Sequence, residues 1–563
     1  MKKLVSLLLV VALMLGTLSI AVADEKPVTI SLLTTRQTAG TNDAEDLWIF
    51  KYLADKFNVK FELSQTMDDT STSQRIGQMY GSGDLPDIVM GINLTNDQVM
   101  SFIEEDYLLS WNDLITPEKM PNTYQAMQDY PDAFAASTAP DGKIYTLPYI
   151  RGAVYYNNTG AYSRSVRVYV NTEWMEKSGV EKMPETLDEV LAMLRAFKEK
   201  DPKGLGEFNM PLVNNSTKFY DYVWHCMGFY GASSTQEYGT RFGIRNGEVV
   251  LPAYTEQAKD FLTFFNTLYN EGLFSKSQFE SDKTMRRGWI SAGYAGVIGD
   301  DTLQYTQEDW PNWVGLPLVT SEYCDKPIAS VNMGYTLHGT WVNSEAKNID
   351  KICEIVDYFY SDEGATLYMY GPMKGEEGYE GYDGWYFDEN GQRTCDAVIR
   401  GEVNGQSTYV DKMISPCYYI GGRFDRASDY LYVMANIEHE PQTLPIHDEL
   451  TGLTQQAIVD RNPTLDNWDG WWNTHQAQVM EGKLTFVILP NVYMTAEQSE
   501  KVADLKALIE NHIKAESAKF IAGVRPLSEF DAYMDELRAL GIEEYVQLHK
   551  DAYAAYMNGI FGN

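Results

Sequence analysis

Cysteine is scarce in this sequence, with five residues in a chain of 563. No two cysteines form a Cys-x-x-Cys pair, which argues against a zinc site and against a thioredoxin-type redox motif. The odd number leaves at least one thiol unpaired, and a disulfide between Cys395 and Cys417 is an open alternative. The seven histidines include no His-Glu-x-x-His pattern, so a zinc hydrolase of that class is excluded as well.

Positive charge is also in short supply, since Lys and Arg total 45 against 80 Asp and Glu. The formal net charge of −35 excludes a polyanion such as nucleic acid as a partner. The sequence has no phosphate loop ending in Gly-Lys-Ser or Gly-Lys-Thr, and Ser291 lacks the preceding glycine of a nucleophile elbow. A glycoside hydrolase needs two carboxylates placed about one bond, and abundance alone does not place them. We therefore expect a protein that is not an enzyme.

Only one apolar run is long enough to span a membrane, and it lies at the amino end. Two lysines precede apolar residues 4–20, and Ala-Val-Ala follows at residues 21–23, as in a secretory signal. We expect residues 1–23 to be a signal peptide that is cleaved before Asp24, so that the protein is exported to the periplasm or the cell surface. An uncleaved anchor is the alternative, because residues 4–23 suffice to cross a bilayer.

The whole chain of 563 residues is 44% hydrophobic and too long for one ordinary domain, so two or more lobes are expected. Residues 28–33 have the pattern of a strand, residues 44–57 that of an amphipathic helix, and residues 59–63 alternate as a second strand. A further helix and the apolar strand at residues 88–90 follow. These units predict an α/β fold with parallel sheets.

Loops at the carboxyl ends of parallel strands are where such sheets bind ligands. Arg36 follows the first strand and Asn93 follows the strand at residues 88–90, so both are candidate ligand contacts. The alternative is that these loops are ordinary surface connections.

A crossing between two sheets is expected near Pro148. An Asp-Gly turn at residues 141–142 leads into an extended run rich in β-branched and aromatic residues. Pro148 interrupts this run and removes a backbone donor that a central strand needs.

Several motifs resemble those of the extracytoplasmic solute-binding proteins, family 1, that serve ABC sugar importers. They include Asp-Gly-Lys-Ile-Tyr at residues 141–145, Gly-Asp-Leu-Pro-Asp-Ile at 83–88, the strand and helices at 167–197, and the closing helices at 494–556. The chain is identified as a member of this family, related to alginate-oligosaccharide-binding proteins. The resemblance implies an α/β, two-lobed fold of the periplasmic-binding-protein type 2, in which each lobe is a mostly parallel sheet flanked by helices, with a helical carboxyl-terminal part.

The resemblance also implies how the chain is divided. Residues 24–150 and 316–360 would form lobe 1, and residues 151–315 and 361–563 would form lobe 2. The lobes would close about crossings near Pro148 and Pro317.

The function implied by the resemblance is capture of a carbohydrate, a neutral oligosaccharide, in a cleft between the lobes. A monomeric protein would deliver the ligand to the membrane subunits of an ABC importer. The alternatives are a peptide-binding protein of the same fold and, more remotely, a secreted glycoside hydrolase. Many family members end the signal in a lipid-accepting cysteine, and residues 20–24 contain none.

Aromatic content fits a sugar site, with 38 Tyr and 12 Trp. Sugars stack their C–H faces on aromatic rings, while their hydroxyls need planar donors and acceptors. By resemblance, the loop after residues 291–299 faces the ligand. The candidate ligand contacts are Arg36, Asn93, Arg151, Tyr155, Trp224, Trp289, Asp300, Asp301, Trp385 and Trp471. For each tryptophan the alternative is a place in the core, and for the two aspartates it is a solvated turn.

No metal or other cofactor is expected. The loop at residues 201–209 stands where several larger family members carry a calcium loop like an EF-hand. Its third and fifth positions, which should provide oxygen ligands, are Lys203 and Leu205. We therefore expect a degenerate loop without calcium.

Overall fold

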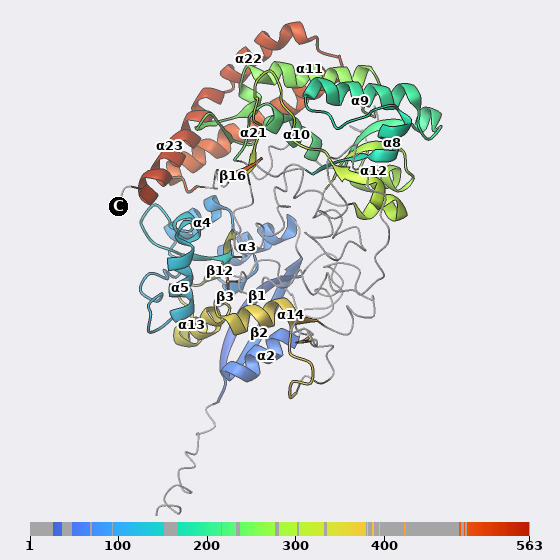
Figure 1. The fold of residues 1–563 in the computed structure, drawn as a ribbon. Coiled ribbons are helices and arrows are strands. Elements are labelled where there is room, and N and C mark those ends of the chain that lie inside the picture. The colour runs from blue at the N-terminus through green and yellow to red at the C-terminus, as the bar shows by residue number, and fades with distance from the viewer. Residues whose placement is uncertain are drawn as a thin grey trace, which may run out of the picture.

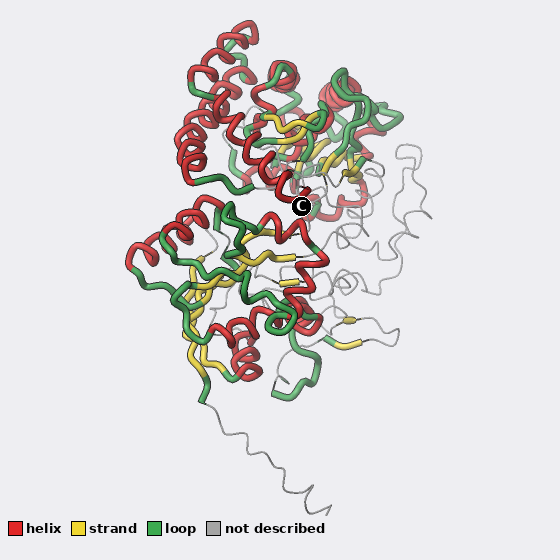
Figure 2. The backbone as a smooth tube through the Cα atoms, turned by 90° about the vertical axis from the view of Figure 1, so that its left-hand side faces the viewer, coloured by secondary structure: helices red, strands yellow, loops and turns green. Residues whose placement is uncertain are grey.

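The structure, a computed structural model, shows two α/β lobes, one above the other in Figures 1 and 2. The described residues are 26–36, 45, 48–67, 70–92, 94–150, 167–215, 217–231, 237–275, 281–300, 303–330, 335–378, 380, 385–387, 393–394, 422–423, 483–485, 489 and 492–561. Among them, no helix combines the length and the apolar character that crossing a membrane requires.

The first lobe is built on a six-stranded sheet in the order β15-β4-β12-β3-β1-β2. Its strands are β1 (Val28–Arg36), β2 (Val59–Met67), β3 (Ile88–Met90), β4 (Thr146–Ile150), β12 (Tyr335–Val342) and β15 (Gly422–Arg423). β12 runs antiparallel to both of its neighbours, and the other five strands share one direction. The expected mostly parallel sheet is therefore confirmed.

Helices cover this sheet on both faces, as a parallel sheet with buried strands requires. They are α2 (Trp48–Phe57), α3 (Thr70–Ser82), α4 (Asn96–Glu104), α5 (Pro121–Asp129), α6 (Pro131–Ala136), α13 (Ile349–Tyr358) and α14 (Asp362–Tyr370). Two clusters of buried apolar residues result, one containing Ile30 and Leu147 and the other containing Leu33 and Val89.

The second lobe is built on a four-stranded sheet in the order β10-β5-β9-β6. Its strands are β5 (Val168–Asn171), β6 (Met210–Asn214), β9 (Ala295–Gly299) and β10 (Trp313–Gly315). Only β5 runs against the others. Its helices are α8 (Thr172–Lys177), α9 (Leu187–Lys200), α10 (Lys218–Cys226), α11 (Gln257–Asn270), α12 (Lys283–Ser291), α21 (Ala496–Ile521), α22 (Phe530–Ala539) and α23 (Ile542–Phe561).

Short elements complete the described fold. Three two-stranded sheets pair β7 (Gly243–Arg245) with β8 (Glu248–Val250), β11 (Ala329–Ser330) with β16 (Leu484–Thr485), and β13 (Tyr386–Phe387) with β14 (Arg393–Thr394). The 3-10 helices are η2 (Gly206–Phe208), η3 (Glu237–Gly239), η4 (Pro252–Tyr254), η6 (Gln304–Asn312) and η8 (Leu527–Glu529).

Helix α9 shows how local sequence starts an element. Thr186 caps it, because its side-chain oxygen accepts the main-chain N–H of Glu189 at 3.1 Å. The Glu189 carboxylate reaches back to the N–H of Glu185, and the apolar face with Val190 and Phe197 is buried. The predicted helix is therefore present, with the reciprocal bond one residue earlier than in a standard capping box.

The lobe boundaries differ from those expected. Leu316 and Ala329 pack in the core of the second lobe, because the main chain after β10 continues to bond β5 through Leu316 N–H and the Val168 oxygen at 2.8 Å. Conversely, α14 contacts β15, and Trp385 packs on the core of the first lobe. When the chain returns to the first lobe, it does so near Tyr335 and stays there beyond residue 360.

Pro148 lies inside β4 and not in a connection between the lobes, which corrects the expected crossing. Leu147 pairs with Thr340 and Tyr149 with Thr336, so the one residue Pro148 faces three residues of β12. This bulge contains His338, whose backbone has φ of 63°. The bulge explains why a proline is tolerated, because the hydrogen-bond pattern between β4 and β12 is interrupted there and needs no N–H donor from residue 148. The chain leaves this sheet after Ile150.

A short segment before α21 packs on the second lobe and also contacts the first. The Leu489 N–H donates to the Gly231 oxygen at 2.7 Å in the second lobe. Tyr493, close by in sequence, packs on the first lobe, with its ring 5.8 Å from that of His338. Helix α21 then contacts α4, and α23 contacts α6. The closing helices, seen along one side in Figure 1, therefore join both lobes.

Acid should weaken the fold before the carboxylates titrate fully. Burial lowers the pKa of His225 and of His338 to about 4, below the ordinary 6.5. The unfolded chain binds more protons between these values, so the free energy of unfolding falls as the pH decreases from 6.5 toward 4. Each histidine should cost on the order of 2 kcal/mol between pH 7 and pH 5. Thermal melts across this range measure the loss.

The matched variant is His338→Asn, since asparagine tolerates the left-handed backbone and has no proton to gain. It should reduce the fall in melting temperature between pH 7 and pH 5. An equal fall in the wild type and the variant would contradict the assignment to His338.

Candidate ligand-binding site

Five strands of the first lobe end at one edge of its sheet. β1, β2, β3, β4 and β15 run in the same direction, and their last residues are Arg36, Met67, Met90, Ile150 and Arg423. The structure thus places Arg36 at the edge where ligands bind in open parallel sheets, although the placement of its side chain is not described.

Three other candidate ligand contacts, which the sequence places after β3 and β4, lie outside the described residues. They are Asn93, Arg151 and Tyr155. The strands that precede Asn93 and Arg151, β3 and β4, both end at the edge just defined.

The second lobe has a corresponding edge. β6 and β9 run parallel and end at Asn214 and Gly299, and β5, which runs the other way, begins there. Asn215 and Asp300 are the next residues along the chain. The Asn215 N–H donates to the Gly299 oxygen at 2.9 Å, and the Asp300 N–H donates to the Arg167 oxygen at 3.2 Å. These bonds extend the sheet by one residue and fix both side chains at its edge.

Glycine at position 299 permits β9 to lie close to Asn214 and to the start of α10. A Cβ atom there would lie 2.4 Å from the Asn214 side-chain oxygen and 3.0 Å from the main-chain nitrogen of Phe219. The same Asn214 oxygen accepts the Phe219 N–H at 3.1 Å at the start of α10. The glycine therefore lets β9 pack against the loop that begins α10.

Asp300 and Asn215 form a buried pair at this edge. Asp300 has no exposed surface and Asn215 is 1% exposed. The Asn215 Nδ2 donates to the Asp300 carboxylate at 2.6 Å, a charge-assisted bond that fixes which way the amide faces. The Asn215 Oδ1 is buried without a hydrogen-bond partner. It is one of several buried polar atoms without a partner among the described residues, and a donor from water or from a ligand would satisfy it.

Charges at the second edge balance. Arg167 and Lys218 are both buried, and so are Asp221 and Asp300. Lys218 begins α10, and Asp221, in its first turn, accepts the Thr217 hydroxyl at 3.2 Å. Among the residues that the structure describes here, two cations with two carboxylates leave no surplus of either sign.

Trp224 belongs to the core of the second lobe, which corrects its selection as a ligand contact. Its side chain has no exposed surface, and its ring stacks on Phe261 with centroids 4.0 Å apart. Because α10 is buried along its whole length, the tryptophan is enclosed by other side chains.

Trp289 lies away from Asp300, so these two candidate ligand contacts do not share one subsite. It occupies the last turn of α12, beside the amino end of β9, whereas Asp300 follows the carboxyl end. Five residues of strand separate these ends by roughly 16 Å. The half-buried Trp289 ring packs against the core of the second lobe.

Trp385 lies on the first lobe, where its half-buried ring packs against the core. Its Nε1 donates to the Gly371 oxygen at 2.9 Å, and its ring meets Phe387 edge-on at 5.3 Å. Asp301 and Trp471 lie outside the described residues.

Asn215 is the residue that sequence reasoning missed. The rule that selected Asp300, a polar residue directly after a parallel strand, applies equally to Asn215 after β6. Strand β6 is hard to predict from the sequence because its apolar run of Met210, Leu212 and Val213 is short and contains Pro211.

The loop at residues 201–209 does not offer the ligand set of a calcium site. The Asp201 carboxylate accepts the N–H groups of Leu205 and Gly206, each at 2.8 Å, so both of its oxygens are engaged within the loop. Lys203 brings an ammonium group to the third position, where calcium needs an oxygen. Among the described residues, no group of three or more His, Cys, Asp or Glu side chains is arranged to hold a metal ion.

Comparison with family models identifies the protein class. The model of the bacterial extracellular solute-binding proteins matches residues 45–366, more than half of the chain. The chain therefore belongs to this family. Its members are solute-binding components of ABC transporters and not enzymes, which confirms the expectation that the protein performs no chemistry on its ligand.

Individual relatives extend over nearly the whole chain. The fructooligosaccharide ABC transporter substrate-binding protein FusA of Streptococcus pneumoniae serotype 4 is 22% identical over 550 residues, 94% of this chain and 90% of FusA. An HMO-binding, ABC-transporter-associated protein of Bifidobacterium longum infantis is 18% identical, with a TM-score of 0.68 over 95% of this chain and 99% of that one. Alginate-binding AlgQ2, solved without calcium, is 21% identical, with a TM-score of 0.60 over 94% and 98%. The two-lobed α/β prediction is confirmed.

Proposed function

We propose that this protein captures a neutral oligosaccharide and delivers it unaltered to the membrane subunits of an ABC importer. The observation that carries the proposal is the Asn215–Asp300 pair, an oriented amide with an unused acceptor at the carboxyl edge of the second sheet. A sugar hydroxyl is a donor of the kind this acceptor lacks. The relatives named for fructooligosaccharide, HMO and alginate support a carbohydrate ligand.

Charge balance favours a neutral sugar over a uronic-acid polymer. Carboxylate groups of a ligand are bound best by paired arginine or lysine side chains. At the second edge, Arg167 and Lys218 are matched by Asp221 and Asp300. The chain as a whole carries a net charge of −35, which disfavours a polyanion further.

Ligand capture would proceed by closure of the lobes. Contacts to both edges stabilise the closed arrangement relative to the open one, and this difference drives the equilibrium. The described residues that flank the two passages between the cores are Ile150 and Val168, and Ala329 and Tyr335, so closure would change the distance between the members of each pair. The contacts of α21 and α23 with the first lobe would limit its range.

We also propose that residues 1–23 direct export and that the protein acts as a monomer at the cell surface or in the periplasm. The family is extracellular, and the amino end has the charged, apolar and small-residue segments of a signal.

A ligand panel tests the proposal. The panel contains three classes of ligand: neutral oligosaccharides such as kestose and human-milk-type glycans, uronic-acid oligomers, and peptides. For each ligand, the shift in melting temperature is measured and the solution is analysed for reaction products. A neutral oligosaccharide at about 100 times its dissociation constant should stabilise the protein by roughly 2.7 kcal/mol. Stabilisation by peptides alone, or turnover of a sugar, would overturn the proposal. A preference for uronic-acid oligomers would overturn its neutral-sugar part.

Variants of the buried pair test the site. Asn215→Ala removes the acceptor, and Asp300→Asn removes the charge that orients it. A hydrogen bond between neutral groups is worth about 0.5–1.5 kcal/mol, so each variant should weaken binding of the best panel sugar by about two- to tenfold. Titration calorimetry measures the affinity.

The control is Asn270→Ala, an exposed amide at the end of α11. It should leave the affinity unchanged. Wild-type affinity in both Asn215→Ala and Asp300→Asn would move the sugar site away from this edge, even if the panel confirms a sugar ligand.

A further inference from the structure

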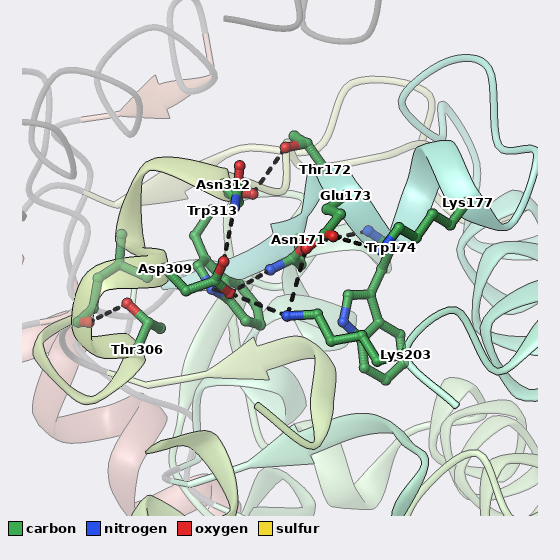
Figure 3. A network of polar contacts seen from close by, with 11 residues as sticks. Asn171, Thr172, Glu173, Trp174, Lys177, Lys203, Thr306, Asp309, Asn312 and Trp313 are labelled. Carbon is green, nitrogen blue, oxygen red and sulfur yellow. Dashed lines mark hydrogen bonds and ion pairs between the residues drawn. The ribbon is translucent and has the colours of Figure 1, made fainter. Parts of the chain in front are cut away.

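A lysine ammonium lies among carboxylates at the outer end of the second lobe. The Lys203 Nζ is 3.6 Å from a Glu173 carboxylate oxygen and 3.6 Å from an Asp309 carboxylate oxygen (Figure 3). The three residues come from separate segments: the loop after α9, the first turn of α8, and η6. The lysine side chain is 24% exposed, so the charges are only partly screened by water.

Asp309 is held in place by neutral donors as well. One of its oxygens accepts the Asn171 Nδ2 at 2.9 Å and the Trp313 Nε1 at 3.1 Å, and the other accepts the Asn312 Nδ2 at 2.8 Å. The carboxylate therefore has a fixed position, and these donors bring no charge to match its own. Lys203 supplies a positive charge from the facing loop (Figure 3).

Glu173 has two ammonium partners. Lys177, one turn along the same helix, pairs with it at 2.6 Å, whereas Lys203 reaches it from the loop. The hydrogen bond from Lys177 is the largest influence that holds the pKa of Glu173 below its ordinary value, and the charge of Lys203 acts in the same direction. The Lys177 pair is local to α8, so only Lys203 connects Glu173 to another segment in this network.

We propose that the ammonium of Lys203 anchors the 201–209 loop to α8 and η6 and so orders the loop without a divalent ion. A metal ion in a loop of the EF-hand kind takes its oxygen ligands from alternate positions of the loop itself. At one of those positions this chain has Lys203, whose ammonium lies beside carboxylates of two other segments. Here a cation attached to the chain draws Glu173 and Asp309 together, while Asp201 closes the loop through the N–H groups of Leu205 and Gly206. The loop would then be ordered without any divalent ion.

The network lies at the end of the second sheet opposite the Asn215–Asp300 pair. Asn171, the last residue of β5, pairs with Trp313, the first residue of β10, whereas Val168 at the other end of β5 pairs with Gly299. Loss of the Lys203 charge should therefore lower the stability of the lobe and leave the sugar edge unaltered. The inference does not depend on the proposed function.

The test compares Lys203→Met with Lys177→Met in the full chain at low salt. Both variants remove an ammonium that faces Glu173, but only the first also removes the partner of Asp309. We expect Lys203→Met to lower the melting temperature by about 2–6 °C and Lys177→Met by less than about 2 °C. Lys203→Arg, which keeps the charge, should stay close to the wild type.

Metal dependence is measured in the same melts. The wild type should melt at one temperature with a chelator and with millimolar calcium chloride. A wild-type melting temperature that rises with calcium and falls with the chelator would overturn the inference. So would equal losses in Lys203→Met and Lys177→Met.

A double variant provides a check that does not rest on a single substitution. If the ammonium acts through Asp309, then Lys203→Met combined with Asp309→Asn should lower the melting temperature by less than the sum of the two single losses. Strict additivity would show that the two charges do not act on each other and would overturn the inference.

Discussion

Parallel strand pairing is the constraint on which the rest of this structure depends. Strands that run in one direction end at one edge, so residues far apart in sequence meet there without any specific contact between them. In the first lobe this brings Arg36 to the level of the ends of β3 and β4. In the second it brings Asn215 beside Asp300, although 85 positions separate them in the chain.

Hydrogen-bonded carboxylates distinguish the two ends of the second sheet. At one end, the Asp300 carboxylate is used to orient an amide whose acceptor remains unused, which suits a ligand with hydroxyl groups. At the other end, Asp309 has both oxygens engaged and an ammonium facing it, which suits a structural brace. Under the two proposals, the same residue type would serve recognition at one edge and stability at the other, because the surrounding donors differ.

The connections between the lobes show how tertiary context overrides local rules. Proline normally disrupts a central strand, yet Pro148 lies between β12 and β15 because the bulge around His338 removes the demand for its missing N–H. The resulting buried histidine packs against Tyr493 from the passage that leads into α21. One irregular position in the first sheet is therefore coupled to the contact between the lobes.

The sequence by itself determined the α/β class and the elements of the first βαβ unit, because periodicity and turn residues are local and strand direction follows from βαβ connections. The family followed from the resemblance of its short motifs. The sequence did not determine which aromatic rings are buried, since burial depends on residues distant in the chain. Trp224 stacks on Phe261 in the core, and Trp289 lies at the far end of β9 from Asp300. Only the tertiary structure showed that Asn215 is the partner of Asp300, because a hydrogen bond between two loops requires the register of two strands to be known.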